Sequence, residues 1–251
     1  MRTLREERLP GPFPVYALPE WSERFPWLVH GTTGRGDDAD PFDLGLFGET
    51  PVGVATRRWL HLRNAFGMPA AVHARQVHGA RIRVHTATGP GLHIGEGDDG
   101  HATTEPGLLL AVSVADCVPV SLVDPEHRAI AVLHAGWRGV AAGILEQGLA
   151  TLARLSGVRP GDIIVHLGPA ICGACYEVGP EVHRALGLEP PARPAPVDLR
   201  ELLARQARAA GVPDDQISVS EHCTRCAGSP FFSHRGGDSG RQMGLLGLRP
   251  A

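Results

Sequence analysis

Three apolar runs that follow one another closely constrain the fold of this chain more than any other feature. Residues 108–114, 118–123 and 129–133 have the length and composition of buried β-strands. Cys117 stands between the first two runs, and His134 follows the third. If the runs pair as neighbouring strands, Cys117 and His134 meet at one edge of a sheet. A cysteine and a histidine that meet in space indicate either a thiolate nucleophile or a metal site.

The composition indicates a globular protein. The chain has 251 residues, of which 43% are hydrophobic, so it can bury a sizeable core. Its net charge is −3 and it shows no basic stripe, so we expect no nucleic-acid partner. No apolar run approaches the roughly 18 residues of a membrane span, and the charged N-terminus has no apolar signal segment behind it. We therefore expect a cytoplasmic protein with no membrane partner.

The chain contains no lysine, so all 24 of its basic residues are arginines. Lysine forms Schiff bases and reaches the phosphates in Walker-type loops, so neither chemistry is expected here. A phosphate or carboxylate ligand must then be held by arginine side chains, backbone amides or a metal ion. Lysine loss is also typical of a biased genome composition, and that plain reading stays open.

Helical and strand patterns are mixed along the chain without a regular strand–helix–strand rhythm. Apolar residues at helical spacing predict helices over 52–66 and 140–155, and Asp198 is a good N-cap for a third helix. Further short strands are predicted at 71–72, 81–84, 163–167 and 217–220, a long loop at 89–106, and a Gly-rich tail beyond residue 220. We predict an α/β fold: a layered sandwich with mixed β-sheets flanked by helices.

The domain organisation follows from the same patterns. Residues 1–28 are rich in proline and aromatic residues and are predicted to form an N-terminal arm, either extended or as an edge strand. Residues 29–251 are predicted to form a single catalytic domain, because the Pro-rich stretch at 190–196 resembles a surface loop more than a domain boundary.

His78 follows the strand predicted at 71–72 and completes a possible zinc site with Cys117 and His134. Two imidazoles and one thiolate leave the fourth tetrahedral position for water or a substrate, as catalytic zinc sites do. Asp116 and Arg138, which adjoin the ligands, are candidates for supporting them and for binding an anion. The alternative is a buried free cysteine with two structural histidines, since 13 histidines can cluster by chance.

Four further cysteines form two Cys-x-x-Cys pairs, Cys172 with Cys175 and Cys223 with Cys226. Two such pairs are typical of a structural four-cysteine zinc site. The pairs are separated by more residues than in a zinc ribbon, so the fold would have to bring them together. Free thiols and a redox pair are the alternatives that the sequence leaves open.

A series of short motifs gives the chain a resemblance to a known family. The motifs are Gln76-Val77-His78-Gly79, Ala115-Asp116-Cys117-Val118-Pro119-Val120, His134-Ala135-Gly136-Trp137-Arg138-Gly139, Gly168-Pro169-Ala170-Ile171, Cys175-Tyr176-Glu177-Val178-Gly179, Cys223-Thr224, Phe231-Phe232-Ser233-His234-Arg235 and Gly240-Arg241-Gln242. Through them most of the chain resembles the YfiH/YlmD-like proteins, once called laccase-domain or multicopper polyphenol oxidases and now treated as purine nucleoside phosphorylases.

The resemblance implies a YfiH-like (cytotoxic necrotizing factor-like) sandwich and a zinc site formed by His78, Cys117 and His134. It also implies phosphate-dependent cleavage of adenosine, inosine, guanosine and methylthioadenosine, with some adenosine deamination. The chain departs from the family pattern in three places. Where the family usually has an Arg-Gly-Gly segment, this chain has Gly34-Arg35-Gly36-Asp37. Asp43 stands where the family usually has Asn, which would add negative charge near a phosphate site, and Gly236 stands where a second arginine usually follows Arg235.

The expected site residues follow from these readings. We expect His78, Cys117 and His134 to act with Asp116 in catalysis, and Asp116 and Asp99 are candidate proton carriers. The substrate nucleoside and phosphate would be bound by Arg138, Arg35, Arg75, Gln76 and Trp137.

Three other functions remain open. Cys117 could be a nucleophile with His134 as its base, as in an amidase or deamidase. Copper-dependent phenol oxidation is less favoured, because the chain has no His-x-His pair. A non-enzymatic metal-binding or assembly module is the third. The oligomeric state is not readable from the sequence.

Overall fold

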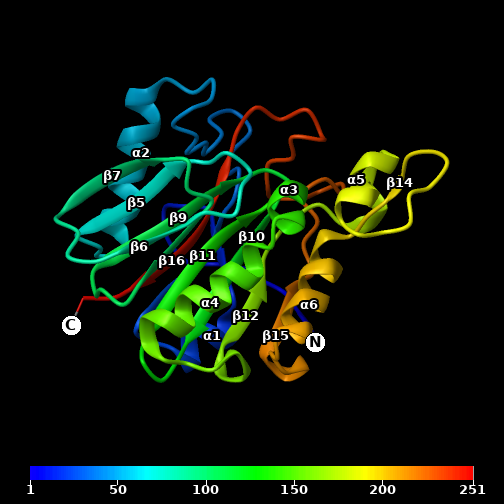
Figure 1. Cartoon of the computed structure of the whole chain (residues 1–251). Helices are drawn as coiled ribbons and strands as arrows, with labels where there is room; N and C mark the ends of the chain where they lie inside the picture. Colours follow the sequence, from blue (N-terminus) through cyan, green and yellow to red (C-terminus); the bar gives the residue numbers. More distant parts are fainter. Residues whose placement is uncertain (251) are drawn as a thin grey trace.

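Two mixed seven-stranded sheets lie face to face and carry helices on their outer surfaces, as the computed structural model of residues 1–250 shows (Figure 1). The strands of the first sheet, in spatial order, are β1 (Arg2–Leu4), β15 (Ile217–Ser220), β12 (Ile164–Leu167), β10 (Val118–Asp124), β11 (Ala129–Ala135), β8 (Gly100–Thr103) and β6 (Ile82–His85). The strands of the second are β2 (Glu7–Arg8), β3 (Val15–Ala17), β4 (Leu28–Thr33), β16 (Gln242–Leu248), β9 (Leu108–Val114), β5 (Ala70–Arg75) and β7 (Gly91–Glu96). The fold is therefore the predicted layered α/β sandwich.

The helices cover the outer face of each sheet (Figure 1). Apolar side chains of α4 and α6 pack on the first sheet, and those of α2 pack on the second. The helices and remaining short elements are α1 (Pro19–Arg24), α2 (Val52–Ala65), α3 (Trp137–Ala141), α4 (Ile144–Ser156), α5 (Pro180–Ala185), α6 (Leu199–Ala209), the 3-10 turns η1 (Pro160–Asp162), η2 (Gly173–Cys175) and η3 (Asp214–Gln216), and a small hairpin of β13 (Glu177–Val178) and β14 (Ala195–Pro196). Within residues 1–250, no helix is long and apolar enough to cross a membrane.

The core has three apolar layers because strand side chains alternate between the two faces of a sheet. Between the sheets, Val132 and Ile130 of β11 meet Leu110 and Val112 of β9. The outer face of the first sheet and the outer face of the second are each sealed by their helices. A strand covered on both faces is apolar throughout, which is why β9, β10 and β11 are continuous apolar runs in the sequence.

Several predicted elements are confirmed. The predicted helix over 52–66 is α2, and the third helix is α6, whose N-cap Asp198 accepts hydrogen bonds from the backbone of Arg200 and Glu201. Strands β10 and β11 pair as neighbours, as expected, and they run antiparallel with Val118 opposite Ala135. Cys117 and His134 thus meet at the ends of interior strands, and not at the edge strand of a sheet. The run 108–114 is a strand, but it belongs to the opposite sheet.

Three local predictions are wrong. The loop predicted at 89–106 contains β7 and β8. Polar residues are tolerated in β7 because it is an exposed edge strand, and in β8 because His101 and Thr103 form hydrogen bonds with His85 of β6. The helix predicted at 140–155 is interrupted, because Gly143 adopts a left-handed conformation (φ 74°) between α3 and α4. The Gly-rich tail contains β16, a fully buried central strand.

The N-terminal segment 1–28 contributes to both sheets. Its strand β1 pairs with β15 at the edge of the first sheet, and β2 pairs with β3 at the edge of the second. Leu18, Trp21 and Phe25, from α1 and its flanks, are buried in the layer between the sheets. This segment therefore closes one end of the central core.

Candidate active site

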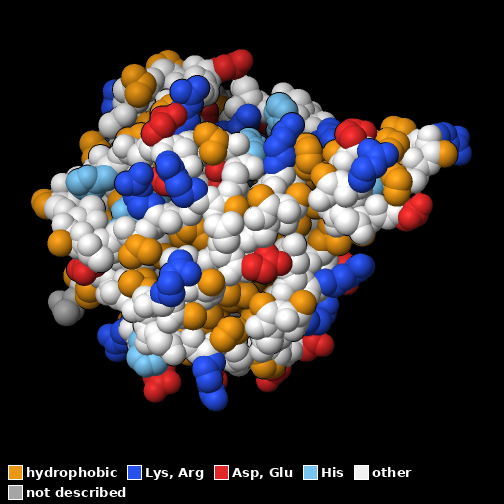
Figure 2. Space-filling view, in the orientation of Figure 1, with side chains coloured by type: hydrophobic (Ala, Val, Ile, Leu, Met, Phe, Trp, Pro, Cys, Tyr) orange, Lys and Arg blue, Asp and Glu red, His pale blue; other side chains and the backbone are white. Residues whose placement is uncertain are grey.

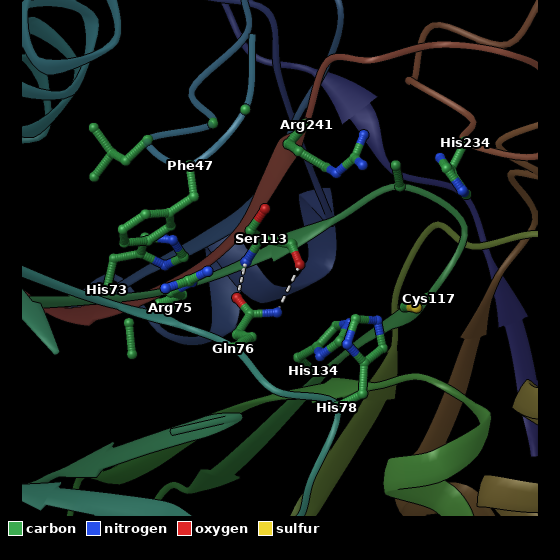
Figure 3. A pocket seen from close by; sticks show the side chains of 15 residues that line it. Phe47, His73, Arg75, Gln76, His78, Ser113, Cys117, His134, His234 and Arg241 are labelled. Atoms are coloured by element: carbon green, nitrogen blue, oxygen red, sulfur yellow. Dashed lines mark hydrogen bonds between the residues drawn. The ribbon is translucent and has the colours of Figure 1, made fainter. Parts of the chain in front are cut away.

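A cavity of about 380 Å³ opens where the loops after β5 and β9 face the end of β11. This volume lies in the usual range for small-molecule sites. Figure 2 shows basic side chains in blue and histidines in pale blue gathered on the upper part of the visible face, in the region between α2 and α3. The side chains that project into the cavity in Figure 3 include Phe47, His73, Arg75, His78, Cys117, His134, His234 and Arg241.

Three side chains from separate elements converge on one wall of this cavity (Figure 3). One donor atom each of His78, Cys117 and His134 lie within 4.8 Å of one another. The two imidazole rings meet edge to face, with centroids 4.8 Å apart. The structure therefore brings together the three residues that the sequence placed at strand ends.

The local backbone makes this convergence possible. Cys117 ends the short crossover from β9 in the second sheet to β10 in the first, and Asp116 in that crossover has a left-handed conformation (φ 83°). His78 also has a positive φ of 60°. Both are uncommon for residues with a side chain and indicate that the surroundings hold these turns in place. A Cβ at Gly136 would lie 3.0 Å from the Cys117 sulfur and 3.3 Å from His78, so only glycine leaves this space open.

Asp99 connects two of the three residues. Its carboxylate accepts hydrogen bonds from the backbone N–H groups of Val77, His78 and Gly79 at 2.8 to 3.1 Å. It also accepts a hydrogen bond from Nδ1 of His134 at 2.8 Å. Because Nδ1 is engaged by the carboxylate, Nε2 of His134 is the atom left for a ligand. Asp99 itself is fully buried.

Cys117 and His134 each shift the pKa of the other. Burial by itself raises the pKa of Cys117, but the charge of His134 and hydrogen bonds from both histidines lower that pKa from 9.0 to about 6. Burial by itself lowers the pKa of His134, but the Cys117 thiolate and the Asp99 carboxylate raise that pKa to about 9. The two histidines therefore favour the thiolate of Cys117, the form that acts as a nucleophile or metal ligand.

The three donors fit a divalent metal ion. Two imidazoles and one thiolate are a ligand set that suits zinc, and three protein ligands leave one tetrahedral position open. The carboxylate of Asp99 behind His134 is the kind of partner that metal-bound histidines have. His78 is exposed, which gives an ion a path from solvent.

The predicted substrate-binding residues are distributed around the site unevenly. Arg75 and Gln76 line the cavity. The amide of Gln76 donates to the Ser113 carbonyl at 2.9 Å and accepts from the Ser113 N–H at 2.6 Å, as the dashed lines in Figure 3 show. Both ends of this amide are thus used to fasten the His78 loop to β9.

Arg138, Trp137 and Arg35 lie outside the lining of this cavity. Trp137 and Arg138 begin α3 directly after Gly136, and the guanidinium of Arg138 lies 4.3 Å from the centre of the Trp137 ring. Arg35 pairs with Asp238 at 3.1 Å and borders a separate surface pocket.

Asp116 is buried, and its carboxylate belongs to a hydrogen-bonded network with residues of the C-terminal part of the chain. Its Oδ1 accepts from the Thr224 hydroxyl at 2.6 Å, and its Oδ2 accepts from the backbone N–H of Arg235 at 2.6 Å. The carboxylate next to Cys117 therefore ties the crossover to two C-terminal loops. Gly236, a third departure from the family pattern, donates its N–H to the Ser233 hydroxyl in one of these loops.

Several cavity residues were not singled out from the sequence as site residues. Phe47 is 53% exposed over the cavity, and His73 lies below it, stacked on Trp59 with ring centroids 5.7 Å apart. Arg241 and His234 reach the cavity from the C-terminal segment. The last two stand inside the motifs of the family resemblance, and that was the available signal.

Asp43, a second departure from the family pattern, is buried and hydrogen-bonds the backbone of two residues that line the cavity, Gly45 and Arg241. Its Oδ1 accepts from the backbone N–H groups of Gly45 and Arg241, both at 2.8 Å, and its Oδ2 accepts from the Thr50 hydroxyl. The Asp43 carboxylate is therefore satisfied by these three donors, and one of them fixes the backbone at Arg241.

The four remaining cysteines form a second cluster. The sulfur atoms of Cys172, Cys175, Cys223 and Cys226 lie within 4.8 Å of one another, which makes a second candidate metal site. All five cysteines of the described chain carry free thiols.

Comparisons with known proteins agree with this architecture. Residues 39–249 match the family model described as "Multi-copper polyphenol oxidoreductase laccase". The chain is 37% identical to the protein named purine nucleoside phosphorylase YlmD of Geobacillus stearothermophilus, over 90% of this chain and 92% of that protein. It is 36% identical to adenosine deaminase RL5 from an unknown prokaryotic organism, over 68% of this chain and 72% of that protein.

Two solved structures have a similar fold over nearly the whole chain. The crystal structure of YlmD from Geobacillus stearothermophilus has a TM-score of 0.87 and 30% identity, and the match covers 97% of this chain and 99% of that one. The crystal structure of YfiH from Bacillus licheniformis has a TM-score of 0.86 and 29% identity, over 96% and 98%. The protein therefore belongs to the YfiH/YlmD family, whose family model is the one described as a polyphenol oxidoreductase.

Proposed function

We propose that this protein is a zinc-dependent purine nucleoside phosphorylase that cleaves the N-glycosidic bond of adenosine, inosine, guanosine or methylthioadenosine with phosphate. The observation that carries the proposal is the convergence of His78, Cys117 and His134 on one wall of a cavity that also holds Arg75 and Arg241. The names of relatives that match most of the chain support the substrate class.

His78, Cys117 and His134 would hold the zinc ion through Nε2 of His134, the Cys117 thiolate and one ring nitrogen of His78. A zinc ion held there would act as a Lewis acid toward an oxygen of phosphate, water or substrate. Asp99 keeps the His134 ring in the orientation that points Nε2 at the site.

Arginine side chains on the cavity wall would bind phosphate. Arg75 and Arg241 are the two arginines that line the cavity, and arginine matches phosphate geometry through paired N–H donors. Positioning phosphate against the sugar carbon and stabilising the developing charge are what the protein contributes to such a displacement. The roles predicted for Arg138, Arg35 and Trp137 stay predictions.

Phe47 and His73 would recognise the base. The exposed ring of Phe47 offers a stacking surface for a purine. Burial lowers the pKa of His73 to about 4, so its ring is neutral at pH 7. Its Nδ1 lies 3.2 Å from the Ala111 carbonyl and must donate there, which leaves Nε2 as a hydrogen-bond acceptor.

A second function uses the same residues. Cys117, His134 and Asp99 are arranged as a thiolate, an imidazole and an orienting carboxylate, which would suit an amidase or deamidase. Adenosine deamination is a further activity that the relative named adenosine deaminase supports.

The test is base release from inosine and adenosine by the purified protein, with and without phosphate. We expect free base and ribose 1-phosphate only when phosphate is present, loss of activity on zinc removal and its recovery on zinc return. Cys117→Ala should lose the same activity. Base release at an equal rate without phosphate would mean hydrolysis, and full activity in zinc-free protein would favour thiolate catalysis.

A further inference from the structure

The four-cysteine cluster stands outside the cavity and outside the function proposed for it. Cys172 precedes the turn η2 and Cys175 is its last residue, while Cys223 and Cys226 lie in the loop that follows β15. The two loops are far apart in the sequence and touch through a backbone bridge between Ala170 and Cys223. The fold thus brings both Cys-x-x-Cys pairs together, which the sequence alone could not show.

The sulfur geometry matches a tetrahedral metal site better than it matches disulfides. The sulfurs of Cys175 and Cys226 are 3.8 Å apart, and all four lie within 4.8 Å of one another. A disulfide requires about 2.05 Å between sulfurs. A zinc ion with Zn–S bonds of about 2.3 Å places its four sulfurs at the corners of a tetrahedron, about 3.8 Å apart.

The surroundings also suit thiolate ligands. The backbone N–H of Cys172 donates to the sulfur of Cys223 at 3.3 Å, and such N–H donors stabilise metal-bound sulfur. Arg225 donates to the carbonyl of Cys175 at 2.9 Å and ties the two loops together beside the sulfurs. Cys226 is exposed and the other three are partly exposed, so an ion can enter from solvent.

We propose that Cys172, Cys175, Cys223 and Cys226 bind a second zinc ion, which acts as a structural clip. Four thiolates fill all tetrahedral positions and leave none for a substrate, unlike the three-donor site. A tetrahedral site of four sulfur ligands is typical of zinc or of iron and of few other metals.

The clip fastens the loop that supports Cys117. Thr224 lies between two of the sulfur ligands, its N–H donates to the Ala170 carbonyl at 3.1 Å, and its hydroxyl donates to Asp116 at 2.6 Å. Asp116 directly precedes Cys117, and its own left-handed backbone conformation sets the direction of the chain at Cys117. Thr224 is therefore a positioning residue. This effect rests on the proposed function of the Cys117 site, whereas the binding of the second zinc does not.

The experiment is a count of zinc and thiols in protein purified anaerobically from zinc-supplemented cells. We expect about two zinc ions per chain in the wild type, and about one in Cys175→Ser/Cys226→Ser and in Cys117→Ala. After chelation in denaturant, all five thiols should react. If the proposed function fails but the clip is right, the wild type holds about one zinc, which the double variant loses and Cys117→Ala keeps.

A cobalt-loaded wild type covers the case in which the double variant does not fold. Five cobalt–thiolate bonds are expected, four from the clip and one from Cys117, so Cys117→Ala should keep about four fifths of the thiolate-to-cobalt charge-transfer absorbance. Three outcomes would overturn the clip: an unchanged zinc count in a folded double variant, fewer than five reactive thiols, or loss of all cobalt–thiolate absorbance in Cys117→Ala. Stoichiometric iron in place of zinc would overturn the assignment of the metal.

Discussion

At the scale of single residues, Asp99 joins the two sides of the site, because its carboxylate holds both the backbone of the His78 loop and the ring of His134. Asp99→Asn replaces one acceptor with an N–H₂ group that faces donors. We expect zinc affinity to fall by about 10- to 100-fold, as measured by competition with a chelator of known affinity.

The neighbouring Asp98 provides the matched control for this substitution. It is also buried, but its carboxylate forms ion pairs with the guanidinium groups of Arg81 and Arg83 and not with His134. Asp98→Asn should leave zinc affinity within about threefold of the wild type. Equal loss of zinc affinity in both variants would mean that general destabilisation, and not the Asp99–His134 contact, is responsible.

The second residue-scale prediction concerns Asp43. Asp43→Ala leaves the buried N–H groups of Gly45 and Arg241 without their acceptor, which should lower the free energy of unfolding by about 1–3 kcal/mol. It should also raise the KM for phosphate, because Arg241 loses its fixed backbone. Asp43→Asn keeps one acceptor oxygen and a donor for Thr50, so urea unfolding and KM should stay near the wild type. A lower stability in Asn than in Ala would contradict this account.

At the scale of elements, Glu6 fastens the N-terminal segment to the first sheet. Its carboxylate binds His166 of β12 at 2.8 Å and Ser220 of β15 at 2.7 Å. Burial by itself raises the pKa of Glu6, but the hydrogen bond and charge of His166 and the Ser220 hydroxyl lower it below 4.5. The ionised carboxylate therefore stabilises the fold above about pH 4.5, and this contribution is lost as the pH falls through the folded-state pKa.

Glu6→Gln tests this contact. We expect the variant to lose about 2 kcal/mol of unfolding free energy at pH 7, and we expect the difference from the wild type to shrink as the pH is lowered below about 4.5. Urea unfolding at several pH values measures both. Glu7→Gln, at an exposed position next to it, should show no difference at any pH. A difference that stays constant down to acid pH would show that the ionised carboxylate is not the cause.

The elements also show how far the sequence predicts this fold. Strands β9, β10 and β11 and the helix α2 could be predicted, because burial imposes a local apolar pattern on each. The sheet to which β9 belongs could not be predicted, because strand partners are chosen by contacts far along the chain. The central strand β16 was missed because its glycines are typical of loops; at Gly244 a Cβ would lie 2.5 Å from Pro119 of the opposite sheet.

The candidate site divides in the same way. His78, Cys117 and His134 could be predicted because each stands at the end of a recognisable strand or beside a motif. His73 and Arg241 could not be assigned from periodicity. His73 is a buried polar residue inside a strand, and Arg241 reaches the cavity from a segment remote from the other site residues. Only the strand order of the second sheet, in which β9 pairs with both β16 and β5, reveals that they share the cavity.

At the scale of the whole molecule, the site depends on how the two sheets are held together. His78 follows a strand of the second sheet, His134 ends a strand of the first, and Cys117 lies in the crossover between them. The distances among the three donors are therefore set by the apolar layer between the sheets. Leu18, Trp21 and Phe25 fill one end of that layer.

This dependence predicts that residues 29–251 do not fold without residues 1–28. Replacing one buried tryptophan or phenylalanine by alanine costs about 3–5 kcal/mol, so removing Leu18, Trp21 and Phe25 together approaches or exceeds the typical stability of a domain, about 5–15 kcal/mol. Deletion of 1–28 should abolish cooperative thermal unfolding and zinc binding at the Cys117 site. Trp21→Ala should keep both, with a lower melting temperature. A shortened chain that melts cooperatively within a few degrees of the full chain would show instead that the predicted boundary at residue 29 separates an accessory arm from a self-sufficient domain.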